Sequence, residues 1–298
     1  MNLEGIHFLL TYKCTYECEH CFVWGSPWQR GTMTLSQVRE VIDQAVDLGT
    51  MKTIYLEGGE PTLLYPVMLR CAQYALSKGL RFGIVTNCHW AESEEDAEAW
   101  LSPLKDMGIS DLSLSSYPYF AEDLERRLLR NAVVAAVKLG IPMGILEVGA
   151  PAEFSDLGIR TAGFGKVMFK GRAAERLAKD NLSRVPATLV TCPHENLASP
   201  GRVHIGADGE VQVCQGLSIG NVFRKPLSEI ARTFDPGAMP VVGDLIRGGP
   251  WQLSASAGLK PDLELYADEC HLCYELRKKL RARFPDVLAP DQCYGVPE

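Results

Sequence analysis

Three cysteines lie within eight residues near the start of the chain, at Cys14, Cys18 and Cys21. They follow the apolar run Ile6–Leu10 directly, so the sequence predicts a cysteine-bearing loop after a first strand. Cysteine thiolates hold iron–sulfur clusters, and a cubane [4Fe–4S] cluster has four irons to ligate. Three local thiolates would leave one iron open to a substrate or cosubstrate. The alternative is a structural zinc site that recruits one distant ligand.

The composition narrows the class of protein. A chain of 298 residues can form one large domain or two smaller ones. Its net charge of −7 argues against nucleic-acid binding, which would favour a basic surface. No apolar run reaches membrane-spanning length, and no secretory signal is present. Ten cysteines without an export signal indicate metal ligation in a reducing compartment. We therefore expect a cytoplasmic metalloprotein with no nucleic-acid or membrane partner.

Strands and helices alternate through the first part of the chain. A capping box at Thr34–Gln37 begins the first helix, and further helices are predicted from Pro66 to Lys78, from Ser93 toward Met107 and over Ala121–Leu139. This alternation predicts a parallel sheet with helices outside it. Too few units are present for a closed eight-stranded barrel, so we expect an α/β fold with an open, partial (β/α)6 barrel. The predicted strands are Ile6–Leu10, Lys52–Glu57, Arg81–Thr86, Asp111–Ser116, Pro142–Val148 and Lys166–Lys170.

Loops that follow strands carry the catalytic groups in barrels of this kind. The cysteine loop, the Gly58–Glu60 turn, the segment Asn87–Trp90 and the segment Ser115–Tyr119 all follow predicted strands. We expect them to meet at one mouth of the barrel.

The pattern changes after about Arg184. Arg202–Ile205 and Glu210–Cys214 are predicted to form a β-hairpin around a turn at residues 207–209. A short helix is predicted at Leu227–Phe234 and a final helix at Tyr274–Phe284, whereas residues 235–261 show no clear element. We place a boundary at residue 186, between a barrel domain at 1–186 and a small α+β domain at 187–298.

The C-x3-C-x2-C spacing, together with Gly58-Gly59-Glu60 after the second strand, resembles the radical S-adenosylmethionine (SAM) enzymes over roughly residues 4–180. The resemblance implies that Cys14, Cys18 and Cys21 bind a catalytic [4Fe–4S] cluster and that SAM chelates its fourth iron. It also implies that the glycine–glutamate turn meets the SAM amino group. Independently of the family, two glycines permit close backbone approach to a ligand, and a carboxylate can pair with an ammonium. The implied chemistry is reductive cleavage of SAM and abstraction of a hydrogen atom from substrate, with the closed barrel mouth shielding the radical.

Three further residues are candidate SAM contacts. His20 occupies a position where the family usually has an aromatic residue against adenine; otherwise it is a solvent-facing loop residue. Ser115, at the end of the fourth strand, is a candidate for the SAM ribose or carboxylate, or a polar strand-end residue. Arg172, after the sixth predicted strand, could contact the SAM carboxylate or form a surface salt bridge.

A second cysteine set lies in the C-terminal segment. The arrangement C…G-x4-C…C-x2-C resembles the twitch (SPASM-like) auxiliary-cluster domain of radical SAM enzymes, which implies one additional [4Fe–4S] cluster and not two. Four thiolates saturate such a cluster, which suits it to electron transfer. A structural zinc ion held by the same thiolates is the alternative. The four residues are Cys192, Cys214, Cys270 and Cys273.

The remaining cysteines have weaker functional interpretations. Cys293 could replace an auxiliary ligand, donate a hydrogen atom, or be inert in a poorly ordered tail, and we favour the inert role. Cys71 is expected in the core of a helix. Cys88 should face the mouth, although packing is favoured over catalysis. The basic run Arg277–Arg283 is a candidate docking site for a reducing partner such as a flavodoxin or ferredoxin, or a solvated helix face.

Three functions compete. The leading one is a twitch-type radical SAM oxidoreductase, dehydrogenase-like, acting on a small polar metabolite. The second is a maturase that crosslinks or epimerises a ribosomal peptide; the early first strand leaves no room for a preceding leader-binding domain, which weakens it. The third is a non-catalytic electron-transfer or zinc-binding protein. Candidate substrate contacts, each also a plausible packing residue, are Trp24, His89, Trp90, Tyr117, Tyr119 and Glu147.

Overall fold

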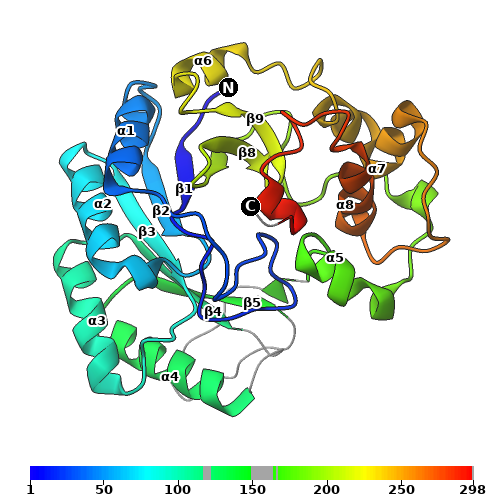
Figure 1. The fold of residues 1–298 in the computed structure, drawn as a ribbon. Helices are drawn as coiled ribbons and strands as arrows, with labels where there is room; N and C mark the ends of the chain where they lie inside the picture. Colours follow the sequence, from blue (N-terminus) through cyan, green and yellow to red (C-terminus); the bar gives the residue numbers. More distant parts are fainter. Residues whose placement is uncertain (117–121, 149–163, 166, 297–298) are drawn as a thin grey trace.

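A single nine-stranded sheet organises the chain in the computed structural model (Figure 1). The structure describes residues 1–116, 122–148, 164–165 and 167–296. The strand order is β6-β5-β4-β3-β2-β1-β7-β8-β9, parallel from β6 to β7 and antiparallel from β7 to β9. The strands are β1 (Gly5–Leu9), β2 (Thr53–Glu57), β3 (Arg81–Thr86), β4 (Asp111–Ser116), β5 (Met143–Val148), β6 (Phe164–Gly165), β7 (Arg202–Ile205), β8 (Glu210–Cys214) and β9 (Leu217–Asn221).

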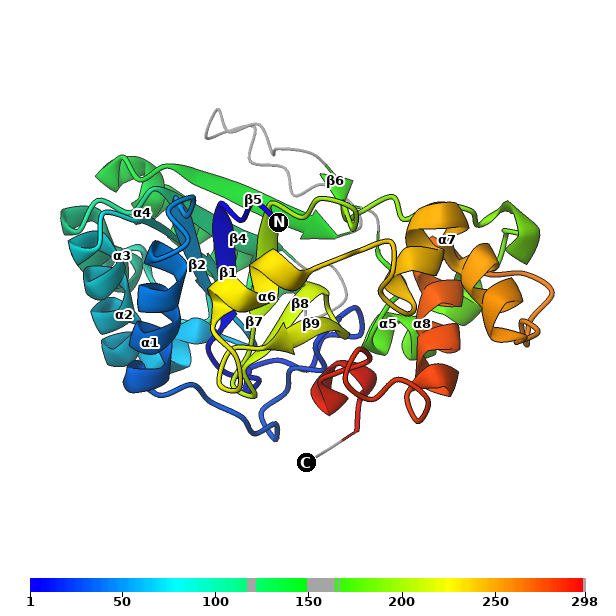
Figure 2. The same ribbon diagram turned by 90° about the horizontal axis from the view of Figure 1, so that it is seen from above.

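Helices cover the outer side of this curved sheet. In Figures 1 and 2, α1 to α4 lie along one side of the molecule, whereas α5, α7 and α8 form a group on the other. Among the described helices, none is long and apolar enough to cross a bilayer. The helices are α1 (Leu35–Val46), α2 (Tyr65–Ser77), α3 (Glu94–Asp106), α4 (Glu122–Leu139), α5 (Arg172–Arg176), α6 (Leu227–Thr233), α7 (Val242–Ala257) and α8 (Glu269–Leu280).

The core forms where apolar residues alternate along strands and recur along helices. Ile6 and Phe8 of β1 are fully buried, and so is the inner face of α1, with Val38 and Ile42. The predicted capping box is present, because Thr34 and Gln37 exchange hydrogen bonds at the start of α1. Since successive strand residues point to opposite faces, the residues between these apolar positions face the barrel interior. His7 of β1 lies among them.

The open partial barrel is confirmed, but two local predictions were wrong. The sixth strand is Phe164–Gly165, and residues 167–170 form no regular element. The last helix begins at Glu269, with the Asp268 carboxylate accepting from the backbone N–H of His271 as its N-cap. Both cysteines of the CxxC motif therefore lie in the first turns of α8.

Residues 235–261, for which no element was predicted, contain α7. The backbone of Gly248 and Gly249 is non-helical and is followed by Pro250, so the helix is kinked. Gly249 has φ +61°, and a Cβ there would lie 2.4 Å from the backbone of Val190 and Thr191. Glycine and proline disfavour helix, which is why the sequence pattern concealed this element.

The predicted hairpin is present as β7 and β8, yet β7 also pairs in parallel with β1, with His7 opposite His204. The sheet is thus continuous across the boundary placed at residue 186. The division into domains at 1–186 and 187–298 stays a prediction.

Candidate active site

The cysteine loop between β1 and α1 is held by backbone hydrogen bonds within itself. The Met33 N–H donates to the Leu10 carbonyl at 2.8 Å, and that of Tyr12 donates to Gly31 at 3.0 Å. Further along, the Cys14 N–H donates to Ser26 at 3.0 Å. These contacts fold the loop back on itself at the carboxyl end of β1. Cys14, Cys18 and Cys21 lie in this loop.

The thiols of this loop receive N–H donors. Gly25 N lies 3.2 Å from Cys21 Sγ, while Tyr16 N and Asn87 Nδ2 lie 3.4 and 3.5 Å from Cys14 Sγ. Burial raises the pKa of Cys14 to about 12, and these donors partly oppose the shift. A buried thiolate needs such donors and a nearby positive charge. Three thiols from one short loop, two of them accepting N–H groups, fit a cluster held by three cysteines.

The Gly58-Gly59 turn contacts this loop through its backbone. A Cβ on Gly59 would lie 2.2 Å from the Lys13 carbonyl oxygen, and one on Gly58, whose φ is +146°, would lie 2.4 Å from the Thr11 oxygen. Glu60 N donates to the Lys13 oxygen at 2.9 Å. The glycines were expected to admit a ligand; in the structure, they admit the cysteine loop itself.

Glu60 is fully buried and saturated with hydrogen bonds. Its Oε1 accepts from Thr62 N, Thr62 Oγ1 and Thr86 Oγ1 at 3.1, 2.6 and 2.9 Å, and its Oε2 accepts from Asn87 N at 2.8 Å. The carboxylate therefore joins the turn after β2 to the loop after β3. A direct contact between this side chain and the SAM amino group stays a prediction.

Arg172 is buried and contacts the cysteine loop from the far part of the chain. Its Nη1 donates to the Cys18 carbonyl at 2.7 Å and its Nη2 to the Gly25 carbonyl at 3.0 Å. Its guanidinium also lies 5.3 Å from the centroid of Trp24. Arg172 Nη2 also lies 3.9 Å from the exposed carboxylate of Glu17, but the guanidinium itself is buried and binds two points of the loop at once. A contact between Arg172 and the SAM carboxylate stays a prediction.

The other candidate SAM contacts lie at the same mouth. Burial, and then the charge of Arg172, lower the pKa of His20 to about 4, so its imidazole is neutral near pH 7. A neutral ring is suited to stacking on a base. Ser115 is buried near the end of β4, opposite Leu146 of β5. Their roles toward SAM stay predictions.

The second cysteine set converges on one cavity, although its members come from three separate segments. Cys192 follows a short 3-10 turn at Pro186–Thr188, Cys214 ends β8, and Cys270 and Cys273 lie one turn apart on α8. All four line a pocket with Lys170 and Arg277. Burial raises the pKa of Cys273 to about 12 and that of Cys192 above its usual range. Four half-buried cysteines around one cavity fit a four-cysteine cluster or zinc site.

Two buried cations face this cavity, and neither was predicted to lie there. Lys170 Nζ lies 3.7 Å from Cys214 Sγ and donates to Gln215 Oε1 at 2.6 Å. Arg277 donates to the Gln215 carbonyl at 3.0 Å. Among the described residues, no carboxylate pairs with Lys170 or Arg277 within 4.0 Å. Four thiolates around a metal centre carry net negative charge, which these cations would balance.

The structure describes the three remaining cysteines, Cys71, Cys88 and Cys293, but not the side chain of Glu147. Cys88 is fully buried with φ +63°, and burial raises its pKa well above the usual range. Cys293 is also buried, with its Sγ 3.3 Å from Gln212 Oε1, in an ordered turn at Asp291–Tyr294 and not in a loose tail. Cys71 is buried in α2 as expected. Glu147 lies in β5, but its side chain is outside the described residues.

The candidate substrate contacts are similarly divided. Trp24 Nε1 donates to Tyr274 OH at 3.1 Å, and Trp90 Nε1 donates to Thr86 Oγ1 at 3.0 Å. Both indoles are thus hydrogen-bonded within the protein, and substrate contact by either stays a prediction. His89 is half-buried, and burial lowers its pKa. Tyr117 and Tyr119 lie outside the described residues.

The basic run of α8 is largely neutralised. Arg277 is buried at the cavity, Lys278 pairs with Glu175, and Arg281 pairs with Asp291. Lys279 lies between Asp262 and Glu275, at 2.7 and 3.0 Å. Docking of a reducing partner on this run stays a prediction. The pairing and burial of these side chains leave little unpaired positive charge to support it.

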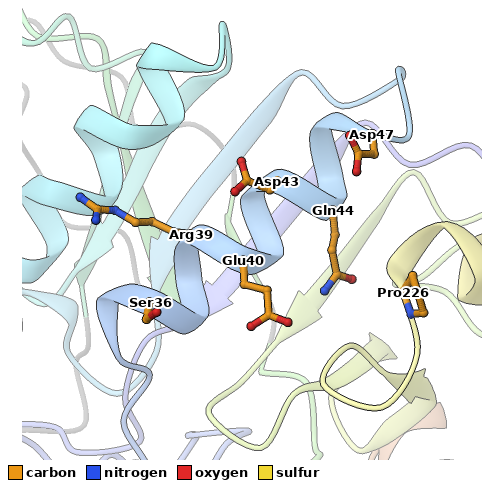
Figure 3. Close-up of a pocket in the computed structure, with 7 residues that line it drawn as sticks. All are labelled: Ser36, Arg39, Glu40, Asp43, Gln44, Asp47 and Pro226. Carbon is orange, nitrogen blue, oxygen red and sulfur yellow. The ribbon is translucent and has the colours of Figure 1, made fainter.

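A shallow hollow elsewhere, on the outer surface of α1 beside Pro226, is shown in Figure 3. Its Asp43 pairs with Lys78 at 2.5 Å and accepts from Tyr74 at 2.8 Å. Gln44 joins α1 to α6 by accepting from Leu227 N at 2.8 Å. These groups satisfy one another on a solvated helix face, so we assign no function to this hollow.

Comparison with known proteins identifies the first part of the chain. The Radical SAM superfamily model matches residues 8–139. The S-adenosylmethionine-dependent nucleotide dehydratase of Selenomonas ruminantium is 30% identical over 82 residues, covering 28% of this chain and 29% of that protein. The subtilosin biosynthesis protein AlbA of Bacillus subtilis (strain 168) is 30% identical over 80 residues, covering 27% and 17%. The GTP 3′,8-cyclase of Pseudomonas putida (strain W619) is 27% identical over 142 residues, covering 47% and 40%.

The match therefore spans less than half the length of each of these relatives. A solved structure extends the likeness of fold over most of the chain. Native anSMEcpe with bound AdoMet and Cp18Cys peptide superposes with a TM-score of 0.55 and 13% identity, covering 95% of this chain and 98% of that one. At this identity, the comparison supports the fold alone.

Proposed function

We propose, from the match of the Radical SAM superfamily model to residues 8–139, that the chain is a radical SAM enzyme of the oxidoreductase type that acts on a small polar metabolite. One observation carries the proposal: Cys14, Cys18 and Cys21 lie in a loop pinned at the carboxyl end of β1 inside the matched region. When bound there, a reduced [4Fe–4S] cluster and SAM supply reductive cleavage of SAM and abstraction of a hydrogen atom from substrate.

The residues around this loop have distinct roles in the proposal. Asn87 and the backbone N–H groups of Tyr16 and Gly25 stabilise the thiolates. Glu60 and Arg172 position the loop from opposite ends, so they act on the cluster indirectly. We assign the contacts to SAM to the backbone of Gly58-Gly59, the neutral ring of His20 and the Ser115 hydroxyl.

The second cysteine set supports an auxiliary [4Fe–4S] cluster in a twitch-like segment. Lys170 and Arg277 would offset the net negative charge of a cluster with four thiolates, and their burial excludes water from it. A saturated cluster offers no iron to substrate, so electron transfer is the function that suits it. The dehydrogenase-like assignment rests on this set.

A peptide maturase is the second candidate, favoured by the partial likeness to AlbA, which is described as a subtilosin biosynthesis protein. The two can be separated without knowing the substrate. The reconstituted, reduced protein is incubated with SAM and with fractions of deuterated cell extract, and 5′-deoxyadenosine is analysed by mass spectrometry. Deuterium incorporation with the small-molecule fraction supports the metabolite proposal, whereas incorporation with the peptide fraction alone supports the maturase.

A further inference from the structure

A cluster of metal-ligating side chains lies inside the barrel, apart from both cysteine sets. His7, Glu57 and His204 come from three neighbouring strands, β1, β2 and β7, and each offers a donor atom within 4.8 Å of the others. The pairing register of the strands brings the three residues together. His7 of β1 lies opposite His204 of β7. Glu57 of β2 lies opposite Leu9, which is two residues after His7 on β1. Residues two apart on a strand share a face.

The three groups lie close together. Glu57 Oε1 lies 3.3 Å from His7 Nδ1 and 3.4 Å from His204 Nε2. Among the described residues, however, Glu57 Oε1 and His7 Nδ1 are buried with no partner in hydrogen-bonding geometry. Donor atoms that lie this close but do not point at one another in hydrogen-bonding geometry are suited to binding one metal ion between them.

The spacing matches a known coordination geometry. Zinc is bound at about 2.0–2.1 Å by histidine nitrogen and carboxylate oxygen, usually with tetrahedral geometry. Ligand atoms at the corners of a tetrahedron of that size are about 3.3–3.4 Å apart. The two measured separations have these values.

The charge of the cluster also calls for a cation. Among the described residues, no lysine or arginine pairs with Glu57, whose only ion-pair neighbours are the two histidines. Burial opposes ionisation of Glu57, but its contact with His7 outweighs burial and keeps the pKa of this carboxyl below the usual range. Burial lowers the pKa of His204 to about 3, so this ring is neutral and keeps a lone pair. A carboxylate and a neutral imidazole are the state in which such residues bind metals.

Neighbouring side chains hold the donors in place. The ring of His7 stacks on Tyr55 with centroids 4.6 Å apart. Gln215 Nε2 lies 3.1 Å from His204 Nε2, and Lys170 fixes that amide through its oxygen at 2.6 Å. A metal ion would take the Nε2 lone pair over from the amide. Arg202, the nearest arginine on β7, is engaged by Glu195 at 3.2 Å.

We propose that His7, Glu57 and His204 bind a divalent metal ion of the zinc type in the barrel interior. Three protein ligands leave a fourth tetrahedral position, which takes water or an oxygen atom of a substrate. The proposal does not rest on the radical chemistry, because none of the three ligands belongs to either cysteine set.

The test uses the full-length protein with its iron–sulfur sites reconstituted, loaded with Zn2+ and washed to remove weakly bound metal. Zinc and iron contents are measured together by plasma mass spectrometry, and ligation is measured by X-ray absorption at the zinc edge. We expect one retained zinc ion with nitrogen and oxygen ligands at about 2.0–2.1 Å. His7→Ala and Glu57→Gln should each weaken zinc binding by more than roughly 100-fold at unchanged iron content, since loss of an outer-shell partner alone costs 10–100-fold.

His194→Ala is the matched control, because His194 forms a competing group with Asp268 and Cys270 beside the auxiliary cavity. This variant should retain the zinc ion. The proposal is overturned if the wild type retains no zinc, if the zinc ligands include sulfur at about 2.3 Å, or if His7→Ala and Glu57→Gln bind zinc as well as the wild type does. An unchanged iron content in the two variants shows that loss of zinc is not loss of folding.

Discussion

Arg172 donates through its Nη1 to the carbonyl oxygen of Cys18 at 2.7 Å, across 154 positions of sequence. Immediately before it, Gly171 has φ +61°, and a Cβ there would lie 2.5 Å from Phe22 Cα. The segment that follows β6 thus closes on the cysteine loop. Formation of the proposed cluster site in this loop would therefore depend on the chain beyond the region that the superfamily model matches.

Arg172→Met should destabilise the loop. It removes two hydrogen bonds to buried carbonyls, each with a charged donor, and we expect a loss of about 2–4 kcal/mol in the free energy of unfolding. Iron incorporation at the first site should fall with it. Arg176→Met, on the exposed face of the same helix, is the control. Equal stability of the two variants in denaturant titrations would contradict the role assigned to Arg172.

The contact between the glycine turn and the cysteine loop gives a second prediction. Gly59→Ala would place a Cβ 2.2 Å from the Lys13 carbonyl oxygen, so the loop must move, at a cost of at least about 1–3 kcal/mol. Gly144→Ala, in β5, has no atom within 4 Å of the added Cβ and should be near neutral. Thermal unfolding and iron content measure both. A Gly59→Ala protein with the unfolding temperature and iron content of the wild type would contradict the close contact between Gly59 and the cysteine loop.

The strand and helix positions in the first 148 residues could be predicted because local signals agree there. Capping residues mark helix starts at Thr34 and Ser93, and apolar alternation marks the strands. By contrast, no local pattern reports that β7 pairs with β1, because that pairing depends on the whole barrel. Nor did the sequence reveal α7, whose middle carries glycines and a proline.

In the candidate site, too, local sequence signals predicted some features and missed others. Cysteine spacing indicated both sets, and the structure brings the second set to one cavity. The burial of Lys170 and Arg277 beside that cavity was missed. Arg277 lies one helical turn beyond Cys273, so a correct start for α8 would have placed it on the same face. Lys170 carries no such signal, because it approaches from a distant loop.

Replacing one proposed auxiliary ligand should affect the auxiliary site and leave the first cluster site intact. Cys273→Ala is expected to lose up to about four iron atoms per chain and to keep SAM cleavage, because the first site is assembled from a different loop. Cys71→Ala, in the core of α2, should keep both sets of iron. Iron analysis and 5′-deoxyadenosine yield measure the outcome. A Cys273→Ala protein with full iron content would mean that this thiol holds no cluster.

Lys170 should tune the auxiliary cluster through its charge. Lys170→Met removes a buried positive charge 3.7 Å from Cys214 Sγ, which disfavours the more negative, reduced cluster. We expect a lower reduction potential for the auxiliary cluster, measured by redox titration with electron paramagnetic resonance. Lys179→Met, on an exposed turn, is the control. A potential equal to that of the control would show that Lys170 does not face the cluster.

Cleavage of SAM tests the central claim most directly. The anaerobically reconstituted protein is reduced with dithionite, given SAM, and analysed for 5′-deoxyadenosine by mass spectrometry, beside a Cys18→Ala variant. The account predicts 5′-deoxyadenosine from the wild type and none from the variant. No 5′-deoxyadenosine from a wild type that carries its full iron, or equal yields from both proteins, would contradict the assignment of Cys14, Cys18 and Cys21 as the catalytic cluster ligands.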